Sequence, residues 1–177
     1  ALARLARVTQ FRSFYLEQRL RETVDALAAV GIRPVLLKGA ALATAAYPTF
    51  GDRAMVDLDV LIPADAAPEA WRAALAGGWM EDPDGEGERE YHHLPTLLDA
   101  RGVHASLELH TEVLAVGHPF GLTADVVRAG AEPLAAHTAG RPDAPAAWLP
   151  RPEHLFVHAA VHFMWQHMAR LHGWKAV

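Results

Sequence analysis

Residues 35–63 read VLLKGAALATAAYPTFGDRAMVDLDVLIP and contain two apolar runs with a small-residue segment between them. The first run, Val35 to Leu37, predicts a buried strand that leads through Lys38 and Gly39 directly into an alanine-rich helix. The second run, Val56 to Ile62, predicts another strand. A strand–helix–strand unit is therefore the expected centre of the fold.

Two aspartates interrupt the second apolar run. Because side chains alternate between the two faces of a strand, Asp57 and Asp59 point to the same side, about 6.6 Å apart along the strand. Two like charges on one face raise each other's pKa unless a cation lies between them. Carboxylate oxygens are the ligands that Mg²⁺ prefers. The pair therefore predicts a magnesium site, and the competing interpretation is a solvated edge strand.

The composition limits the class of protein. The chain has 177 residues, 51% of them hydrophobic, which is enough to build the core of one domain. Its net charge of −5 disfavours binding to a long phosphate backbone. It has no cysteine, which excludes disulfides and thiolate metal sites, and no apolar run approaches the roughly 20 residues of a membrane span. We therefore expect a cytoplasmic protein that binds neither nucleic acid nor a membrane.

A long helix is predicted before the central unit. Apolar residues recur at steps of three to five from Leu2 to Val30, and arginines occupy much of the other face. Gly31 then suits a left-handed helix end. At about 45 Å, this helix is expected to extend along the domain or into a partner.

The segments after the central unit predict further helices. Asp65 is the expected N-cap of one helix, which has Trp71 on its inner face. Residues 81–90 are acidic and contain Gly and Pro, which predicts an exposed loop. A Pro-rich stretch from Gly140 to Pro152 is interpreted as a linker. It leads to a last helix whose expected apolar side consists of Leu155, Phe156, Ala159, Phe163 and Met164.

Residues 91–113 predict a hairpin whose second arm supplies a third acid. The hairpin turns around Ala100 to Gly102. From Val103 to Leu109, apolar residues alternate with a polar face that carries Glu108 and His110. This arm is able to pair with the strand that carries the two aspartates, which would bring three carboxylates together.

Histidines are the second group of candidate ligands. They recur along and beyond the last helix, at His154, His158, His162, His167 and His172. Histidines one helical turn apart are able to chelate zinc, although no carboxylate stands between them as in zinc proteases. The competing interpretation is that they pack against the sheet.

The motifs together resemble a known family. In order, the chain contains LLKGAALA, YP, G-x-R-x-x-x-D-x-D-x-L-I, LELH and a closing P-x-x-L-x-x-H-x-x-x-H helix. Their order and spacing resemble the uncharacterised nucleotidyltransferase family of the DNA polymerase β-like superfamily. The fold expected is α+β: a small mixed β-sheet with a long N-terminal helix and a C-terminal helical part. We divide the single domain into an N-terminal helix (1–32), a nucleotidyltransferase core (33–115) and a helical part (116–177).

The resemblance implies a catalytic metal site. Asp57, Asp59 and Glu108 would hold Mg²⁺ or Mn²⁺, with Glu108 completing a second metal position or acting as general base. The implied reaction moves NMP from a nucleoside triphosphate to a small-molecule or protein acceptor and releases pyrophosphate. His110, His158 and His162 are candidates for contacts to the acids or the nucleotide.

The resemblance also implies a phosphate-binding turn. Gly39 takes the turn position, where backbone N–H groups at a helix start approach a phosphate. Ala40 stands where the superfamily usually has Ser or Gly, so a hydroxyl is missing. We expect Lys38 or Arg53 to contact the phosphates instead.

Two other functions remain open. The missing hydroxyl at Ala40 and the long N-terminal helix favour a non-catalytic nucleotide-binding or toxin–antitoxin-type interaction protein with the same fold. The histidines of the last helix favour a zinc hydrolase.

Overall fold

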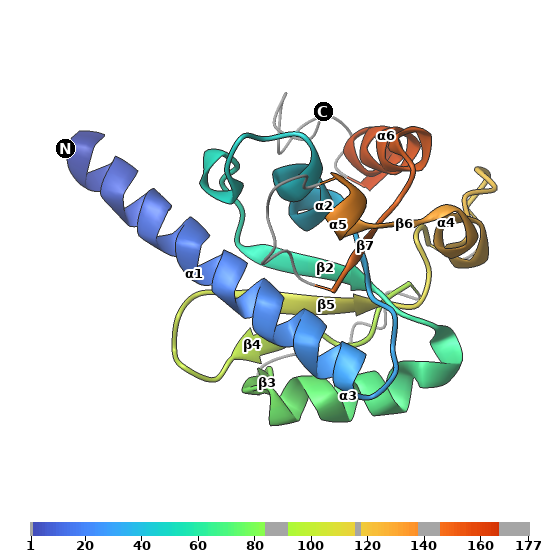
Figure 1. Cartoon of the computed structure of the whole chain (residues 1–177), viewed down its shortest axis with the longest axis horizontal. Coiled ribbons are helices and arrows are strands. Elements are labelled where there is room, and N and C mark those ends of the chain that lie inside the picture. The colour runs from blue at the N-terminus through green and yellow to red at the C-terminus, as the bar shows by residue number, and fades with distance from the viewer. Residues whose placement is uncertain (1, 84–91, 116–117, 138–145, 167–177) are drawn as a thin grey trace.

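The computed structural model of the chain describes residues 2–83, 92–115, 118–137 and 146–166. The described residues form a mixed seven-stranded sheet in the order β3-β4-β5-β2-β1-β7-β6 (Figure 1). The strands are β1 Val35–Leu36, β2 Asp57–Leu61, β3 Trp79–Glu81, β4 Leu97–Asp99, β5 Ser106–His110, β6 Glu132–Pro133 and β7 Trp148–Leu149.

Helices lie on both sides of this sheet. The α-helices are α1 Leu2–Ala29, α2 Lys38–Ala45, α3 Ala67–Ala76, α4 Ala124–Gly130, α5 Leu134–His137 and α6 Pro152–Val161. Short helical turns are η1 Phe50–Asp52, η2 Ala64–Ala66 and the π-helical η3 His162–Gln166. The predicted α+β fold, with a small mixed sheet, a long N-terminal helix and C-terminal helices, is confirmed. Among the described residues, no helix has the length and apolar character needed to cross a membrane.

The central strands place the acids side by side. β2 and β5 run parallel, with Asp57 opposite Ser106 and Asp59 opposite Glu108. β1 pairs antiparallel with β2 on its other edge. The predicted pairing of the Glu108 strand with the Asp57/Asp59 strand is therefore confirmed.

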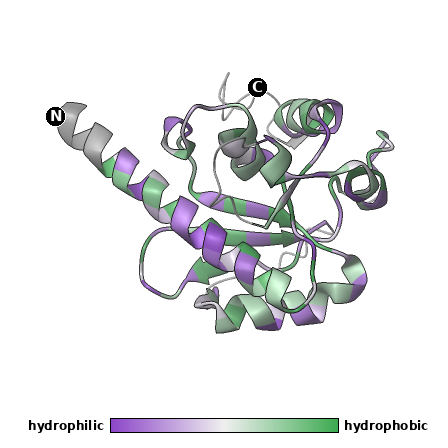
Figure 2. Ribbon diagram, viewed as in Figure 1, coloured by the Kyte–Doolittle hydropathy of each residue, from purple (hydrophilic) through white to green (hydrophobic). Residues whose placement is uncertain are grey.

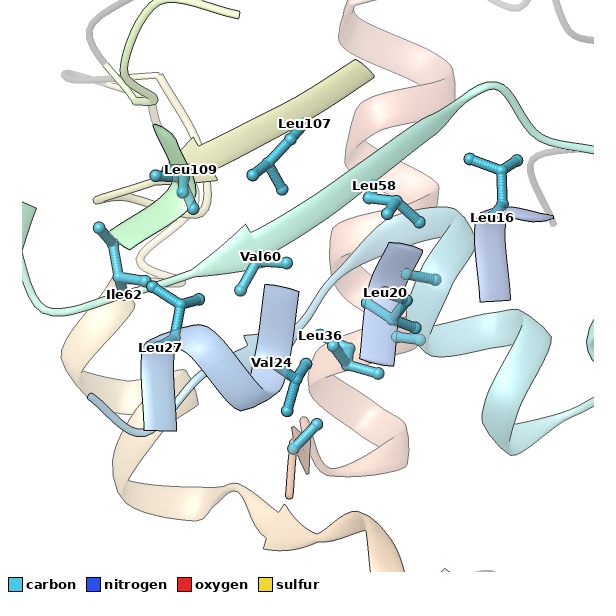
Figure 3. Close-up of a cluster of buried hydrophobic side chains, with 14 of the residues drawn as sticks. Leu16, Leu20, Val24, Leu27, Leu36, Leu58, Val60, Ile62, Leu107 and Leu109 are labelled. Atoms are coloured by element: carbon cyan, nitrogen blue, oxygen red, sulfur yellow. The ribbon is translucent and has the colours of Figure 1, made fainter. Parts of the chain in front are cut away.

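The apolar face of the central strands packs against α1. Leu58 and Val60 of β2 are fully buried, as are Leu20, Val24 and Leu27 of α1 (Figure 3). Burying one such side chain contributes about 1.5–3 kcal/mol. A second apolar cluster lies on the other face, where Leu61 packs with residues of α4 and α6. The sheet is thus covered on both faces, and the polar side chains of β2 and β5 lie on the second face.

Helix α1 agrees with the sequence prediction in extent but not along its whole apolar stripe. It ends at Ala29, and Gly31 has the expected left-handed backbone, with φ of +78°. Its N-terminal half projects from the sheet (Figures 1 and 2), so Val8, Phe11 and Phe14 are 56%, 68% and 68% exposed. Periodicity alone assigned Val8 and Phe11 to the buried face, and this is wrong because that half of the helix extends beyond the sheet.

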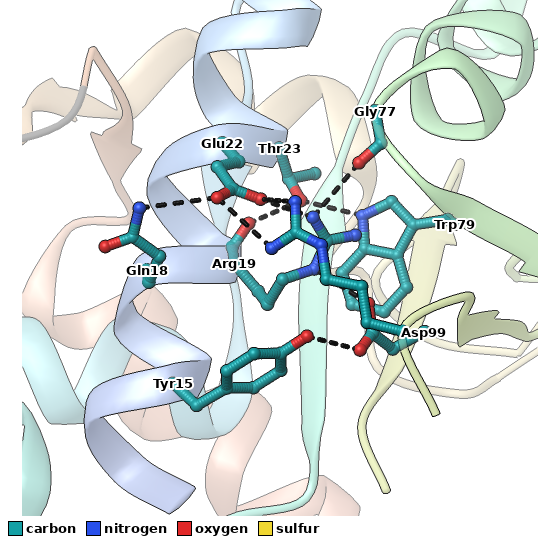
Figure 4. Close-up of polar contacts among 9 residues, drawn as sticks. Tyr15, Gln18, Arg19, Glu22, Thr23, Gly77, Trp79 and Asp99 are labelled. Carbon is teal, nitrogen blue, oxygen red and sulfur yellow. Dashed lines mark hydrogen bonds and ion pairs between the residues drawn. The ribbon is translucent and has the colours of Figure 1, made fainter. Parts of the chain in front are cut away.

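Arg19 is a second exception, because this arginine lies in the core rather than on the outer face (Figure 4). Its Nε is 3.0 Å from Asp99 Oδ1, and neither side chain is accessible to solvent. The guanidinium lies over the Trp79 ring, 4.3 Å from its centre, while Trp79 donates a 2.9 Å hydrogen bond to Thr23. Tyr15 donates to the other oxygen of Asp99. This network joins α1 to β3 and β4.

Two local predictions are corrected and one is confirmed in part. The N-cap of α3 is Ala66 rather than Asp65, since Asp65 belongs to the preceding turn η2. Trp71 packs against the core as predicted, but it is only partly buried, and the fully buried residues of α3 are alanines. The Pro-rich linker contains strand β7, which pairs parallel with β1, so tertiary pairing overrides its loop-like composition.

The last helix buries only part of the predicted apolar side. Leu155 is buried as predicted, whereas Phe156 and Met164 are 66% and 63% exposed, and His158 and Val161 are buried instead. Residues at steps of three lie on one side of a helix, and the helix turns the side of Leu155, His158 and Val161 inward. The part of the predicted acidic loop from residue 84 on, and the histidines at 167 and 172, lie outside the described residues.

Candidate active site

The candidate site lies where β2, β5 and the start of α2 meet. Asp59 is only 1% exposed, and the Glu108 side chain opposite it is 20% exposed. Asp57 is half-buried and lies two residues before Asp59 on the same strand. Strand periodicity therefore predicted the shared face correctly, and the parallel register supplies the third carboxylate.

Lys38 bridges two of these acids. Its Nζ lies 2.7 Å from Asp59 Oδ1 and 3.3 Å from Glu108 Oε2, and its side chain is 16% exposed. Lys38 has a φ of +40°, a left-handed conformation that residues with a side chain rarely adopt. The turn residue with positive φ is thus Lys38 rather than the glycine after it, and the turn brings its ammonium group over the carboxylates.

His110 contacts the same two acids from within the sheet. Its Nε2 lies 2.9 Å from Asp59 Oδ1 and 3.4 Å from Glu108 Oε2, and the side chain is fully buried. Among the described residues, Asp59, Glu108 and His110 form the one group of three ligand atoms close enough to hold a metal ion, all within 4.8 Å of one another. The imidazole of His110 is thus part of the same cluster as the carboxylates of Asp59 and Glu108.

The pKa values of the three acids are shifted in different directions. Burial, and then the neighbouring charges of Asp59 and Glu108, raise the pKa of Asp57. Burial alone would also raise the pKa of Asp59, but Lys38 and His110 hold that pKa well below its ordinary value. Burial would raise the pKa of Glu108 too, but His110 and Lys38 outweigh it and lower that pKa. Asp59 and Glu108 are therefore ionised partners of the two bases.

The pKa values of the two bases, Lys38 and His110, are both raised. Burial by itself would lower the pKa of Lys38, but the charges of Asp59 and Glu108 raise it above its ordinary value. His110 behaves alike, because its hydrogen bonds to the same two carboxylates outweigh burial and raise its pKa. The ammonium of Lys38 consequently remains charged across the neutral pH range.

A cavity of about 380 Å³ opens beside this cluster. Lys38, Gly39 and Arg53, which the resemblance assigns to the phosphates, line it together with Asp57, Asp59 and His162. Its volume falls within the range of about 300–1,000 Å³ that is typical of ligand sites. Five of the candidate metal and phosphate residues thus share one cavity, whereas Glu108 is not among the residues that line it.

The first helix also contributes to the cavity, which sequence reasoning missed. Thr9, Arg12 and Ser13 of α1 line the cavity together with Lys38, Gly39 and Leu42 of α2. Arg12 is oriented by hydrogen bonds of 2.6 Å to the ring and the carbonyl of His104. Only the tertiary packing of α1 against η1 brings these residues to the site.

The structure separates Ala40 from this cavity. Ala40 is fully buried in the main apolar cluster, and it is not among the residues that line the cavity. Its methyl group therefore packs in the core rather than facing the phosphate position.

Three further histidines surround His110. His92 and His93, which sequence reasoning also missed, have ring centres 5.5 and 5.2 Å from that of His110. The adjacent pair precedes β4 in sequence, and only the bridge between His93 and His110 reveals its position. On α6, His158 is 3% exposed, and its ring centre is 6.4 Å from that of His162. Within the described residues, none of the α6 histidines belongs to a three-ligand group.

Because His158 is buried as the neutral imidazole, we expect it to make stability depend on pH. Burial, and then Lys38, lower the pKa of His158 to about 3 from its ordinary 6.5. In the unfolded chain, His158 is protonated as the pH falls through about 6.5, whereas in the folded chain it stays neutral. The contribution of the neutral His158 to the free energy of unfolding is therefore fully present above pH 6.5 and is lost as the pH falls below it. Between pH 7.5 and 5, wild type should lose roughly 2 kcal/mol more than His158→Leu.

Urea unfolding of both proteins at the two pH values measures this difference. A variant that loses as much stability as wild type over this interval would show that His158 is already protonated in the folded state.

The fold and the site together define the class of protein. Carboxylates on adjacent parallel strands, beside a strand-to-helix turn and a ligand-sized cavity, suit metal-assisted transfer of a phosphate-linked group. The chain matches the uncharacterised nucleotidyltransferase family over residues 1–175, and it therefore belongs to that family. No curated protein and no solved structure matched the chain. Membership of this family confirms the resemblance found in the sequence motifs.

Proposed function

We propose that the protein is a Mg²⁺- or Mn²⁺-dependent nucleotidyltransferase that moves NMP from a nucleoside triphosphate to a small-molecule or protein acceptor. One observation carries the proposal: Asp59 and Glu108 lie in register on parallel strands, with Asp57 beside them and the Lys38–Gly39 turn at the same cavity. Family membership supports the class of reaction.

The acids fit a divalent metal ion. Asp59 Oδ2 is buried and has no hydrogen-bond partner among the described residues, so one ligand oxygen remains available beside Asp57. Carboxylate oxygens suit both Mg²⁺ and Mn²⁺. When bound, the ion neutralises phosphate charge and orients the reacting phosphorus.

Residues of the chain bind the triphosphate and accept the proton. Arg53 and the N-terminal backbone of α2 hold the triphosphate, since the start of α2 has no side-chain cap. Glu108 accepts the proton of the acceptor hydroxyl. The acceptor oxygen forms a bond to the α-phosphorus, the bond from that phosphorus to the bridging oxygen breaks, and pyrophosphate leaves.

Thermal unfolding with each nucleoside triphosphate, with and without Mg²⁺, tests this proposal. Nucleotide at 100 times its dissociation constant stabilises a fold by about 2.7 kcal/mol, which corresponds to roughly 5–10 °C for a chain of this size. We expect the shift to require Mg²⁺ and to disappear in Asp57→Asn. A folded protein that no nucleotide stabilises would contradict the proposal, and Mg²⁺-dependent binding without pyrophosphate release would favour the non-catalytic alternative.

We expect Gly39→Ala to weaken nucleotide binding without unfolding the protein. An added Cβ would lie 3.5 Å from Met55 Sδ and 3.8 Å from Arg53 Nε, which are ordinary contacts, so the fold has room for it. The methyl group would nevertheless occupy the cavity at the phosphate-binding turn. Calorimetric titration with nucleotide should show at least a tenfold loss of affinity with an unchanged unfolding temperature. The control for binding is Gly121→Ala, where an added Cβ meets nothing within 4 Å and which lies outside the cavity lining.

A further inference from the structure

Lys38 places a positive charge of the chain between two of the candidate metal-binding carboxylates. In two-metal transfer sites the ions lie about 3.5–4 Å apart and share carboxylate ligands. Here, Lys38 Nζ lies within 3.3 Å of both Asp59 Oδ1 and Glu108 Oε2. A divalent ion on the same two oxygens would face the ammonium at close range, and the two positive charges would repel strongly. Lys38 and a second ion therefore exclude each other.

The backbone holds Lys38 in this position. Its φ of +40° costs about 1–2 kcal/mol for a residue with a side chain. Such conformations persist only where the surrounding structure determines them. The side chain is largely buried and runs from the start of α2 to β2 and β5. Lys38 is therefore a built-in part of the site rather than a surface side chain that happens to lie nearby.

A lysine is also the basic residue best suited to replace an ion. Its ammonium is a compact point charge with three donors, whereas arginine presents a planar fork. Two of these donors face Asp59 and Glu108. Most basic residues of this chain are arginines, and a lysine stands at this position. The ammonium thus supplies the charge and the contacts of an ion without needing one.

The other carboxylate oxygen of Asp59 does not contact Lys38 or His110 in the described contacts. Asp59 Oδ2 has no hydrogen-bond partner among the described residues, and Asp57 lines the cavity on the same strand. We propose that Lys38 takes the place of the second metal ion, so that one divalent ion, held by Asp57 and Asp59, serves each active site. This inference rests on the proposed nucleotidyl transfer and states how many ions that site uses.

Counting bound Mn²⁺ tests the inference. The full chain is mixed with a nucleoside triphosphate whose α–β bridge is an uncleavable methylene group, and free Mn²⁺ is measured by its electron paramagnetic resonance signal. We expect one bound Mn²⁺ per protein–nucleotide complex in wild type and two in Lys38→Met. The control Arg72→Met, which removes an exposed charge that pairs with Glu69 on the same helix, should give one.

Each outcome decides the question. Two ions in wild type, or one ion in Lys38→Met, would overturn the inference, because Lys38 would then not be what excludes the second ion. No nucleotide-dependent Mn²⁺ binding in wild type would overturn the proposed function itself, and the inference with it.

A second variant covers the case in which Lys38→Met does not fold. Glu108→Gln removes one partner of Lys38 but neither proposed ligand of the single ion. The count should therefore stay at one, and a fall to zero would place the ion on Glu108 and overturn the inference.

Discussion

Asp59→Asn is expected to abolish pyrophosphate release from nucleoside triphosphate. Among the residues that the structure describes, Asp59 is the one that contacts both Lys38 and His110 and also has a buried carboxylate oxygen without a hydrogen-bond partner. A bound metal ion contributes several kcal/mol of transition-state stabilisation, so the rate should fall by a factor on the order of 10³ or more. Initial rates at saturating nucleotide and Mg²⁺ measure this loss.

The control for Asp59→Asn is Asp65→Asn, which changes the same side chain at an exposed position on η2. The control should keep the wild-type rate. Near-normal turnover in a folded Asp59→Asn protein would exclude the proposed site, because no other carboxylate among the described residues joins β2 to both bases.

Asp99→Asn is expected to cause a large loss of stability. Arg19 and Asp99 form an ion pair that no solvent reaches (Figure 4), and removing one partner of a buried pair costs about 3–5 kcal/mol. Glu22 also contacts Arg19 but is partly exposed, so it compensates poorly. For a chain of this size, the unfolding temperature should fall by roughly 6–20 °C.

A double-mutant cycle separates the charge effect from simple loss of packing. Arg19→Met combined with Asp99→Leu replaces both charges by apolar groups, and we expect it to be more stable than either single variant. If the costs of the two single variants simply add, the pair does not act as a buried ion pair, and the reason given for the loss would be wrong.

The sequence predicted the centre of the fold because the signal there is local. Val56 to Ile62 is an apolar run, and alternation alone places Asp57 and Asp59 on one face. The same alternation assigned Glu108 and His110 to a shared face, and the parallel register with β2 confirms it. Backbone geometry alone determines which side chains share a face of a strand, so the sequence predicts that face without knowledge of the fold.

The predictions that failed depended on partners distant in sequence. Periodicity does not tell whether a helix face meets the sheet, and so it placed Phe11 in the core and Arg19 outside. Composition indicated a linker around Trp148, which instead pairs with β1. In each case the deciding contact joins residues that are far apart along the chain.

The same division applies to the candidate site. The sequence by itself determined the carboxylates, their common face and the family, because motif spacing and strand alternation are properties of short segments. Only the tertiary structure decided that Lys38 lies between Asp59 and Glu108 and that Arg12 of α1 reaches the cavity. The physical reason is that charge pairing depends on distances of a few ångströms between separate elements, and packing and register alone set those distances.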